Sequence, residues 1–226
     1  MDAKTLASAI DQTLLKPTVG YKEAARWMEA SAGRGFATLC VSPFLVPLAA
    51  GVLAGTGTAV CTVCGFPLGY ALTESKAEEA RHLVELGAVE VDVVVNVAQL
   101  LEGEDRYVVD DLAAVVTSVR DASEGTGLVK VILETGHLTA GDIARGCRLA
   151  VEAGADFVKT STGFGPRGAS IEDVALMRET VGPDIGVKAA GGIRDLQTAF
   201  AMIEAGANRI GTSSGIEILD ALAARG

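Results

Sequence analysis

The chain has 226 residues, of which 49% are hydrophobic and 21% are charged. This composition predicts one soluble globular domain, residues 1–226, with a large apolar core. The formal net charge of −10 repels polyanions and anionic lipid surfaces, so we expect neither a nucleic-acid partner nor a membrane partner. A small anionic ligand remains compatible with this charge, because a local pocket of cations and helix N-termini acts at short range.

The chain has no apolar run long enough for a membrane span, and its first residues, MDAKTLASAIDQT, lack the apolar segment of a secretion signal. We therefore expect a cytoplasmic protein. Cys40, Cys61, Cys64 and Cys147 lie within apolar segments, which is typical of reduced, buried thiols. Cys61 and Cys64 have the CxxC spacing of redox and zinc sites, but no second pair accompanies them, so buried thiols explain this spacing better.

Apolar runs bounded by glycine alternate along the chain with longer amphipathic segments. The runs predict strands at residues 10–15, 36–41, 58–64, 90–96, 128–134, 156–161, 186–190 and 209–213. The amphipathic segments predict helices at residues 21–32, 73–86, 98–122, 140–153, 171–181, 196–205 and 216–224.

A weak repeat supports this division into units. The segments ELGAVEVD (85–92), EAGADFVK (152–159) and EAGANRIG (204–211) each join a helix-ending Gly-Ala to a strand. About eight such units in a chain of this length predict an α/β fold, a single (β/α)8 TIM barrel, in preference to a doubly wound sheet. Functional residues of such barrels gather at the carboxyl ends of the strands, which directs attention to the polar residues there.

Asp92 lies inside the apolar segment VEVDVVVN, where its charge must be paired, hydrogen-bonded or neutralised. With a period of two, it shares a strand face with Val94 and Asn96. A structural ion pair and a proton-transfer carboxylate are both open interpretations of this residue.

Lys159 and Lys188 lie near the carboxyl ends of two neighbouring predicted strands. If both point inward, like charge and desolvation lower the pKa of an amine and produce the free base that attacks aldehydes. The alternative is a structural network in which Asp92 and Glu134 neutralise both lysines. Lys130 falls early in its strand, towards the face of the barrel that serves stability, and we do not include it among the site residues.

Two glycine-rich loops follow the last two predicted strands. Gly191 and Gly192 lie in the first, and Ser213 and Ser214 lie in the second. Exposed backbone N–H groups and a following helix N-terminus form the usual phosphate site of these barrels. The loop STGFGPRGAS (161–170) after Lys159 brings Gly163 towards the same site.

The chain has two histidines, His82 and His137, and a catalytic metal site usually takes about three protein ligands with histidine prominent. We therefore expect no metal site, and amine chemistry rather than metal-assisted chemistry.

The segments EVDVVVN, VKVILETG, DFVKTSTGFG and GVKAAGGIR occur in this order, preceded by DQTLLKP and followed by RIGTSS. Together they resemble the deoxyribose-phosphate aldolase family over nearly the whole chain. The resemblance implies a lyase, a class I aldolase with a (β/α)8 fold and without metal or cofactor. Such an enzyme reversibly cleaves 2-deoxy-D-ribose 5-phosphate to D-glyceraldehyde 3-phosphate and acetaldehyde in deoxyribonucleoside and carbohydrate catabolism.

The resemblance also implies roles for particular residues. Lys159 corresponds to the Schiff-base lysine, Lys188 to the lysine that perturbs it, and Asp92 to the acid/base aspartate. The phosphate contacts and an aspartate close to the substrate hydroxyls correspond to Gly163, Gly191, Gly192, Ser213, Ser214 and Asp11. The chain departs from the family pattern at Gln12, where members often carry histidine, and at Phe164, where certain members carry lysine.

Two other functions fit the residues. One is a phosphosugar isomerase that uses Asp92 or Glu134 as its base, with the lysines as electrostatic clamps. The other is a phosphosugar-binding barrel without catalytic activity. The apolar helix surface of such a barrel is sufficient for a homodimer or a higher homo-oligomer.

Overall fold

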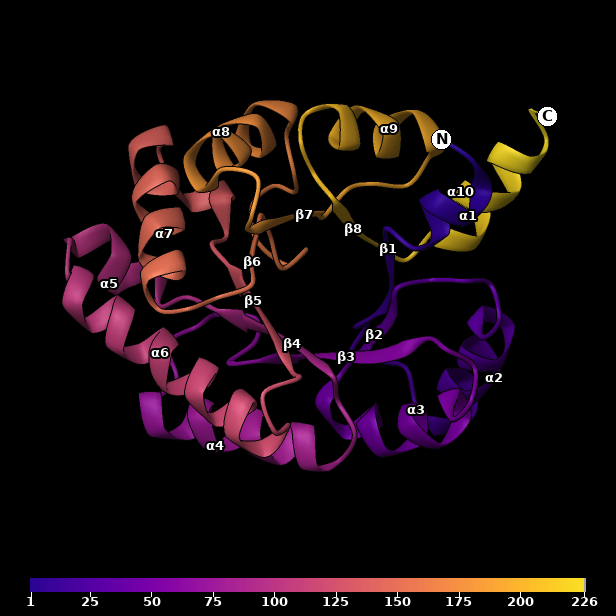
Figure 1. Ribbon diagram of the computed structural model, residues 1–226, viewed down its shortest axis with the longest axis horizontal. Coiled ribbons are helices and arrows are strands. Elements are labelled where there is room, and N and C mark those ends of the chain that lie inside the picture. The colour runs from indigo at the N-terminus through magenta and orange to yellow at the C-terminus, as the bar shows by residue number, and fades with distance from the viewer. Residues whose placement is uncertain (226) are drawn as a thin grey trace.

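Eight short segments, most of them rich in β-branched residues, form a closed barrel in the computed structural model, which describes residues 1–225 (Figure 1). All eight strands are parallel, and each pairs with its neighbours in chain order until β8 pairs with β1. The strands are β1 (Ile10–Leu14), β2 (Thr38–Val41), β3 (Ala59–Cys64), β4 (Glu90–Val94), β5 (Leu128–Ile132), β6 (Phe157–Lys159), β7 (Gly186–Ala190) and β8 (Arg209–Thr212).

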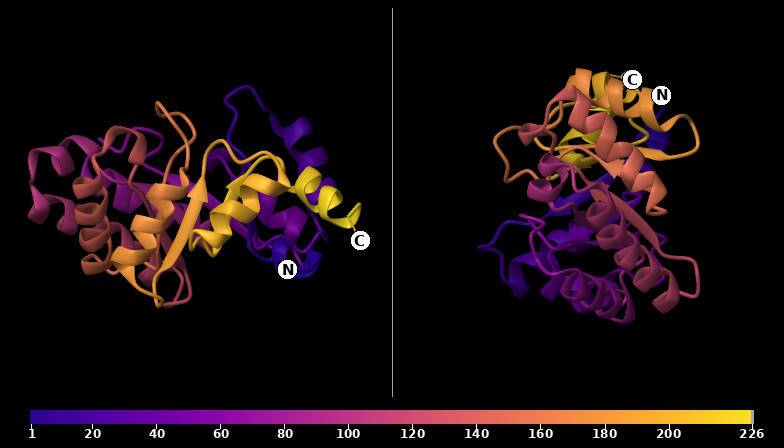
Figure 2. Two further views of the ribbon diagram at one scale, coloured as in Figure 1. Left: turned by 90° about the horizontal axis from the view of Figure 1, so that it is seen from above. Right: turned by 90° about the vertical axis from the view of Figure 1, so that its left-hand side faces the viewer.

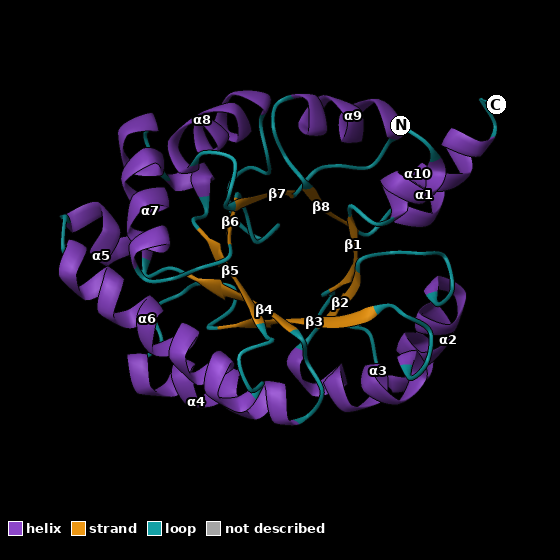
Figure 3. Ribbon diagram, in the orientation of Figure 1, coloured by secondary structure: helices purple, strands orange, loops and turns teal. Residues whose placement is uncertain are grey.

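The helices form a ring around the barrel (Figure 3). They are α1 (Ala3–Ala7), α2 (Tyr21–Ser31), α3 (Val46–Leu53), α4 (Thr73–Glu85), α5 (Val97–Glu102), α6 (Asp105–Ala122), α7 (Ala140–Glu152), α8 (Ile171–Val181), α9 (Leu196–Glu204) and α10 (Gly215–Ala223), with short 3-10 helices η1 (Pro43–Leu45) and η2 (Thr135–His137). Helix α1 packs against α10, so the first and the last helix of the chain lie side by side (Figure 2). Within residues 1–225, every helix is too short or too polar to cross a lipid bilayer.

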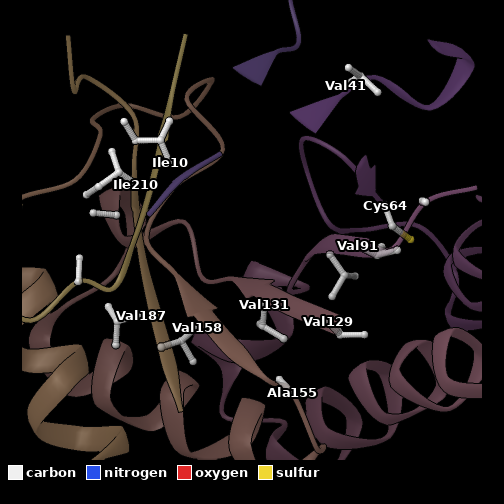
Figure 4. Packing of buried hydrophobic residues seen from close by; sticks show 14 of the residues in the cluster. Ile10, Val41, Cys64, Val91, Val129, Val131, Ala155, Val158, Val187 and Ile210 are labelled. Carbon is white, nitrogen blue, oxygen red and sulfur yellow. The ribbon is translucent and has the colours of Figure 1, made fainter. Parts of the chain in front are cut away.

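The main apolar core lies between the strands and the helices. Alternate strand residues point outward into it, and in β4 these are Val91 and Val93, on either side of Asp92. Figure 4 shows valines and isoleucines of several strands in this layer, among them Val91, Val129, Val131, Val158, Val187 and Ile210. The outward positions thus form the apolar core, whereas an inward position such as that of Asp92 carries a charged side chain.

The predicted (β/α)8 barrel is confirmed, and every predicted strand is present. Several strands end earlier than predicted, because the residues at their carboxyl ends begin loops. Asn96 shows this: it does not continue β4 beside Asp92 but caps α5, and its side chain accepts a hydrogen bond from the backbone N–H of Gln99. The expectation that Asn96 shares a strand face with Asp92 is therefore wrong.

The helix predictions need three corrections. The single helix predicted over residues 98–122 is two helices, because Gly103 has φ of +82° and closes α5. Helix α1 was not predicted, because five residues are too few to show a period. Helix α3 was not predicted either, because VPLAAGVL is apolar throughout and shows no amphipathic alternation.

The three Gly-Ala corners of the repeat have the expected conformation. Gly87, Gly154 and Gly206 have φ values of +113°, +89° and +112°, which other residues rarely adopt. Each glycine ends the helix and turns the chain directly into the next strand.

The four cysteines are free and buried, as expected. Cys61 points into the barrel, where it packs with Cys40, whereas Cys64 belongs to the outer core and lies 3.2 Å from the carbonyl oxygen of Lys76. Residues three apart on a strand face opposite sides, so the CxxC spacing forms no thiol pair here.

Candidate active site

Asp92 lies in the barrel interior, on β4, and its side chain is fully buried. Its Oδ2 atom is 2.7 Å from Nζ of Lys159 and 2.7 Å from Nζ of Lys188. Its Oδ1 atom accepts a hydrogen bond from Nζ of Lys130 at 2.8 Å. One buried carboxylate therefore pairs with three ammonium groups.

Two further buried carboxylates lie beside this cluster. Asp11 Oδ2 is 2.5 Å from Nζ of Lys188, and Asp11 Oδ1 is 2.6 Å from Nη1 of Arg209. Glu90 Oε2 is 2.5 Å from Nζ of Lys130 and 3.0 Å from Nη1 of Arg209. We call the connected set the interior charge network; it consists of Asp11, Glu90, Asp92, Lys130, Lys159, Lys188 and Arg209.

Within the part of the chain that the structure describes, the interior charge network holds four cationic side chains and three carboxylates. One cation is therefore in excess when all seven groups are ionised.

Strand register explains why these side chains meet. Lys159 and Lys188 are direct neighbours in the pairing of β6 with β7, and Asp92 and Lys130 are direct neighbours in the pairing of β4 with β5. All four side chains point inward, and closure of the barrel brings the two pairs together across its interior.

The charges surrounding Asp92 determine its ionisation. Burial by itself raises the pKa of this carboxyl, but the ammonium groups of Lys130, Lys159 and Lys188 outweigh it and hold the pKa well below its usual range. Burial lowers the pKa of Lys188, but Asp11 and Asp92 outweigh it and raise the pKa above its usual value. Asp92 is therefore an anion and Lys188 a cation at neutral pH.

A cavity of about 570 Å³ opens at the carboxyl ends of the strands, and Lys159 is the member of the interior charge network that lines it. Asp92 and Lys188 are fully buried below Lys159. The wall of the cavity includes the predicted phosphate-contact residues Gly163, Gly191, Gly192, Ser213 and Ser214. The structure thus places one reactive amine and two glycine-rich loops on the same cavity.

Gln12 is a cavity residue to which the sequence analysis gave no role. It is 1% exposed, and its Oε1 atom accepts a hydrogen bond of 2.8 Å from the backbone N–H of Gly215, at the first turn of α10. Gln12 thereby anchors the loop that carries Ser213 and Ser214. The cavity wall also carries the charged residues Lys16, Arg194, Glu23 and Glu217.

The exclusion of Lys130 from the site was wrong. Its position early in β5 suggested a role in stability alone, but its long side chain reaches both Asp92 and Glu90. Burial lowers the pKa of Lys130, and Asp92 with the other nearby anionic groups outweighs it, so the pKa is well above its usual value. Its direct register with Asp92 is the signal that could have identified it.

The expected contact of Asp11 with substrate hydroxyls does not fit its position. Asp11 is fully buried, does not line the cavity and is paired with Lys188 and Arg209. Glu134 does not neutralise either site lysine as the structural alternative required; its carboxylate accepts hydrogen bonds from Thr162 instead.

Two sets of buried groups have ligand atoms close enough to hold a metal ion. One comprises Cys40, Cys61 and Asp92, and the other comprises Asp11, Cys61 and Glu90. Each carboxylate in these sets already pairs with lysine or arginine. A metal ion at either position would have to compete with these cations, so the donor sets fit ammonium groups better than a metal.

Gly211 allows Lys188 to reach its position. A Cβ atom there would lie 3.0 Å from Cε of Lys188 and 2.9 Å from Cβ of Ala190. Gly211→Ala is therefore expected to displace the Lys188 side chain and to slow the reaction of Lys159 with an aldehyde by about 10–100-fold. The rate of borohydride-trapped adduct formation measures this effect.

Gly51→Ala is the matched control for this substitution. Gly51 lies on α3, and a Cβ atom there would have no neighbour within 4 Å. This variant is expected to keep the wild-type trapping rate and to gain about 0.5–1 kcal/mol of stability, because alanine favours the helix. Equal trapping rates for the two variants would contradict the role of Gly211.

Comparison with known proteins adds the decisive observation: residues 1–221 match the family described as DeoC/LacD family aldolase. The chain belongs to this family. It is 53% identical over 215 residues to the deoxyribose-phosphate aldolase of Geobacillus sp. strain WCH70, with 95% of each chain covered. It is 52% identical over 215 residues to that of Bacillus subtilis strain 168, again with 95% of each chain covered.

A solved structure supports the same relationship. The deoxyribose phosphate aldolase from Aeropyrum pernix, whose structure is described as a unique tetramer, superposes with a TM-score of 0.90 at 32% identity. The match covers 100% of this chain and 94% of that chain. The similarity therefore extends over the entire barrel, including the elements that carry the interior charge network.

Proposed function

We propose that the protein is a class I aldolase that reversibly cleaves 2-deoxy-D-ribose 5-phosphate to D-glyceraldehyde 3-phosphate and acetaldehyde. The observation that carries this proposal is the position of Lys159. Its side chain lines the cavity, and its Nζ atom shares the Oδ2 atom of Asp92 with the Nζ atom of Lys188. The names of the relatives at about 50% identity support the choice of substrate.

The chemistry begins with the amine of Lys159. Its lone pair attacks C1 of the open-chain sugar, and loss of water gives a protonated imine. The C3 hydroxyl then loses its proton, the C2–C3 bond breaks, and its electron pair moves to the imine nitrogen. Glyceraldehyde 3-phosphate leaves, and an enamine of two carbons remains on Lys159. Protonation at C2 and addition of water release acetaldehyde and the free amine.

Asp92 and Lys188 are suited to moving protons around the Lys159 nitrogen. The Asp92 carboxylate contacts both amines, so a proton can pass between Lys159 and Lys188 through it. Because Asp92 remains ionised, it also stabilises the positive charge of the imine.

We assign the phosphate group of the substrate to the glycine-rich loops that form the wall of the cavity. Gly163, Gly191 and Gly192 line the cavity and have positive φ values, which glycine adopts readily. Ser214 precedes the N-terminus of α10, where the helix dipole favours an anion. Holding the phosphate here aligns the sugar carbonyl with Lys159.

The site geometry disfavours an isomerase. Asp92 is surrounded by three ammonium groups that make it a weak base. Glu134 does not line the main cavity and is bonded to Thr162. Neither carboxylate is free to remove a proton from a substrate carbon.

A borohydride trap tests the proposal. The protein is incubated with acetaldehyde or deoxyribose 5-phosphate, reduced with borohydride, digested and analysed by mass spectrometry. An alkylated Lys159 peptide is expected. Retained substrate binding without any adduct would favour an isomerase or a binding protein.

Lys188→Leu is expected to slow adduct formation at neutral pH by about 10²-fold and to shift the pH–rate profile towards higher pH. Lys188 shares the Oδ2 atom of Asp92 with Lys159, at 2.7 Å from each Nζ atom, so its removal leaves this oxygen to Lys159 and takes one cation out of the network. The trapping rate measured between about pH 6 and pH 10 reports the shift. A profile that superposes on that of the wild type would count against this coupling.

The proposed reaction belongs to deoxyribonucleoside breakdown, and we expect it to occur in the cytoplasm because phosphorylated sugars do not cross membranes unaided. We further propose that the chain forms a homodimer or a higher homo-oligomer. The tetramer described for the Aeropyrum pernix relative supports this proposal.

A further inference from the structure

Glu134 adopts an unusual backbone conformation directly after β5. Its φ and ψ are +57° and +59°, in the left-handed region. Among the residues that the structure describes, Glu124 is the other non-glycine residue with positive φ. Such a conformation costs free energy and is retained only where surrounding contacts stabilise it.

The carboxylate of Glu134 contacts the loop that follows Lys159. The side chain is 4% exposed, and its Oε2 atom accepts hydrogen bonds from the backbone N–H of Thr162, at 3.2 Å, and from the Thr162 hydroxyl. The Thr162 hydroxyl in turn accepts a hydrogen bond of 3.0 Å from the backbone N–H of Phe164. Glu134 therefore organises three consecutive residues, Thr162 to Phe164.

The loop that follows Lys159 also packs closely against the Glu134 carboxylate. A Cβ atom on Gly165 would lie 2.7 Å from Cδ of Glu134, so the backbone approaches closer than any other residue would permit. Two further contacts join the segments: Thr135 donates its backbone N–H to Thr160 at 2.9 Å, and Arg167 donates to the carbonyl oxygen of Thr135 at 3.0 Å.

The other side of this loop faces the proposed substrate. Thr162, Gly163 and Phe164 line the cavity that Lys159 enters, whereas Glu134 lines a separate hollow behind them. Farther along, the backbone N–H of Ala169 lies 3.1 Å from the carbonyl oxygen of Gly191. The position of the loop is thus coupled to the glycine-rich loop that contains Gly191.

The charge of Glu134 has no ion-pair partner among residues 1–225, so its partners are the neutral donors of Thr162. Hydrogen bonds to a charged acceptor are stronger than those between neutral groups. The Glu134 carboxylate is therefore the side-chain acceptor that orders Thr162 and Phe164 within this loop.

We propose that Glu134 is a positioning residue that sets the phosphate side of the cavity by holding Thr162, Gly163 and Phe164 in place, without touching the substrate itself. This inference rests on the proposed aldolase function. The interior charge network and Glu134 then have different roles. The network sets the electrostatic environment of the Lys159 amine, and Glu134 positions the loop residues that line the phosphate site.

The test compares three substitutions at Glu134. Glu134→Ala removes the acceptor, and Glu134→Asp shortens the side chain so that the carboxylate no longer reaches Thr162, while aspartate tolerates the left-handed backbone. Both are expected to raise KM for deoxyribose 5-phosphate about tenfold while kcat changes less than about twofold. Glu134→Gln keeps the length and one acceptor oxygen and is expected to restore KM to within about threefold of the wild type.

The trapping rate with acetaldehyde separates the proposed role from a general loss of structure, because a general loss of structure would lower this rate too. Acetaldehyde reacts with Lys159 but carries no phosphate, so its borohydride-trapping rate is expected to remain within about twofold of the wild type in all three variants. Inhibition by inorganic phosphate should weaken in the alanine and aspartate variants. If the alanine variant does not fold, the aspartate variant decides the test.

Glu124→Ala is the matched control, because Glu124 is exposed and also has positive φ, but lies in the turn before β5. An unchanged KM in the Glu134 variants would overturn the inference. A parallel loss of acetaldehyde trapping, or an equal rise of KM in the control, would do the same. Absence of any adduct in the wild type would instead reject the aldolase function itself.

Discussion

Lys159→Leu is expected to lower kcat by at least about 10⁴-fold and to abolish the borohydride adduct, because the covalent intermediate requires the amine. The other two lysines of the interior charge network cannot substitute for it. Lys188 and Lys130 are fully buried, do not line the cavity and have raised pKa values that keep them protonated. The measurement is steady-state turnover together with mass spectrometry of the reduced protein.

The same variant is expected to remain folded. Asp92 keeps Lys130 and Lys188 as partners at 2.8 Å and 2.7 Å, and leucine fills most of the space of the lysine stem. Its midpoint of thermal unfolding should lie within a few degrees of the wild type. Lys22→Leu, on the exposed surface of α2, serves as the control and should retain full activity. Near-normal turnover of Lys159→Leu would refute the assignment.

Asp92→Asn is expected to lower the free energy of unfolding by about 3–5 kcal/mol and to abolish activity. The substitution leaves the ammonium groups of Lys130, Lys159 and Lys188 around an uncharged amide in a dry interior. Unfolding in urea measures the loss. Asp220→Asn is the matched control, because Asp220 pairs with Arg34 on the surface, where both side chains are exposed. It should change stability by less than about 1 kcal/mol.

The stability difference between the wild type and Asp92→Asn should depend on pH in one direction. The folded-state pKa of Asp92 is well below its unfolded value, so the contribution is fully present above the unfolded pKa of about 3.9 and declines as the pH falls towards the folded pKa. The difference should therefore be constant above about pH 5 and shrink below about pH 4. A difference that shrinks between pH 8 and pH 6 would contradict this assignment.

The elements of the barrel could be predicted because each carries a local signal. Apolar strands such as Gly186–Ala190 have the predicted bounds, since β-branched or small apolar residues and flanking glycine mark both ends. The carboxyl ends of other strands were placed too far along the chain. There, apolar residues such as Val95 continue past the last paired residue, and only the geometry of the barrel ends the pairing.

The candidate site was predicted in part. Lys159, Lys188 and Asp92 stood out because charged residues in apolar strands need partners, and the family resemblance assigned their roles. The reach of Lys130 was misjudged, because position along a strand does not tell how far a long side chain reaches across a barrel. Glu134 was named as a candidate base, and its contact with Thr162 had no signal in the sequence.

The sequence by itself determined the alternation of strands and helices, the apolar outer layer and the set of charged residues that must lie inside. These follow from local periodicity, from the free-energy cost of exposing apolar groups to water and from the cost of burying unpaired charges. Only the tertiary structure decided which charges meet. Lys188 and Asp92 are 96 residues apart in the chain, yet they share a hydrogen bond of 2.7 Å. Barrel closure and strand register, which involve all eight strands together, create that contact and leave Lys159 alone facing the cavity.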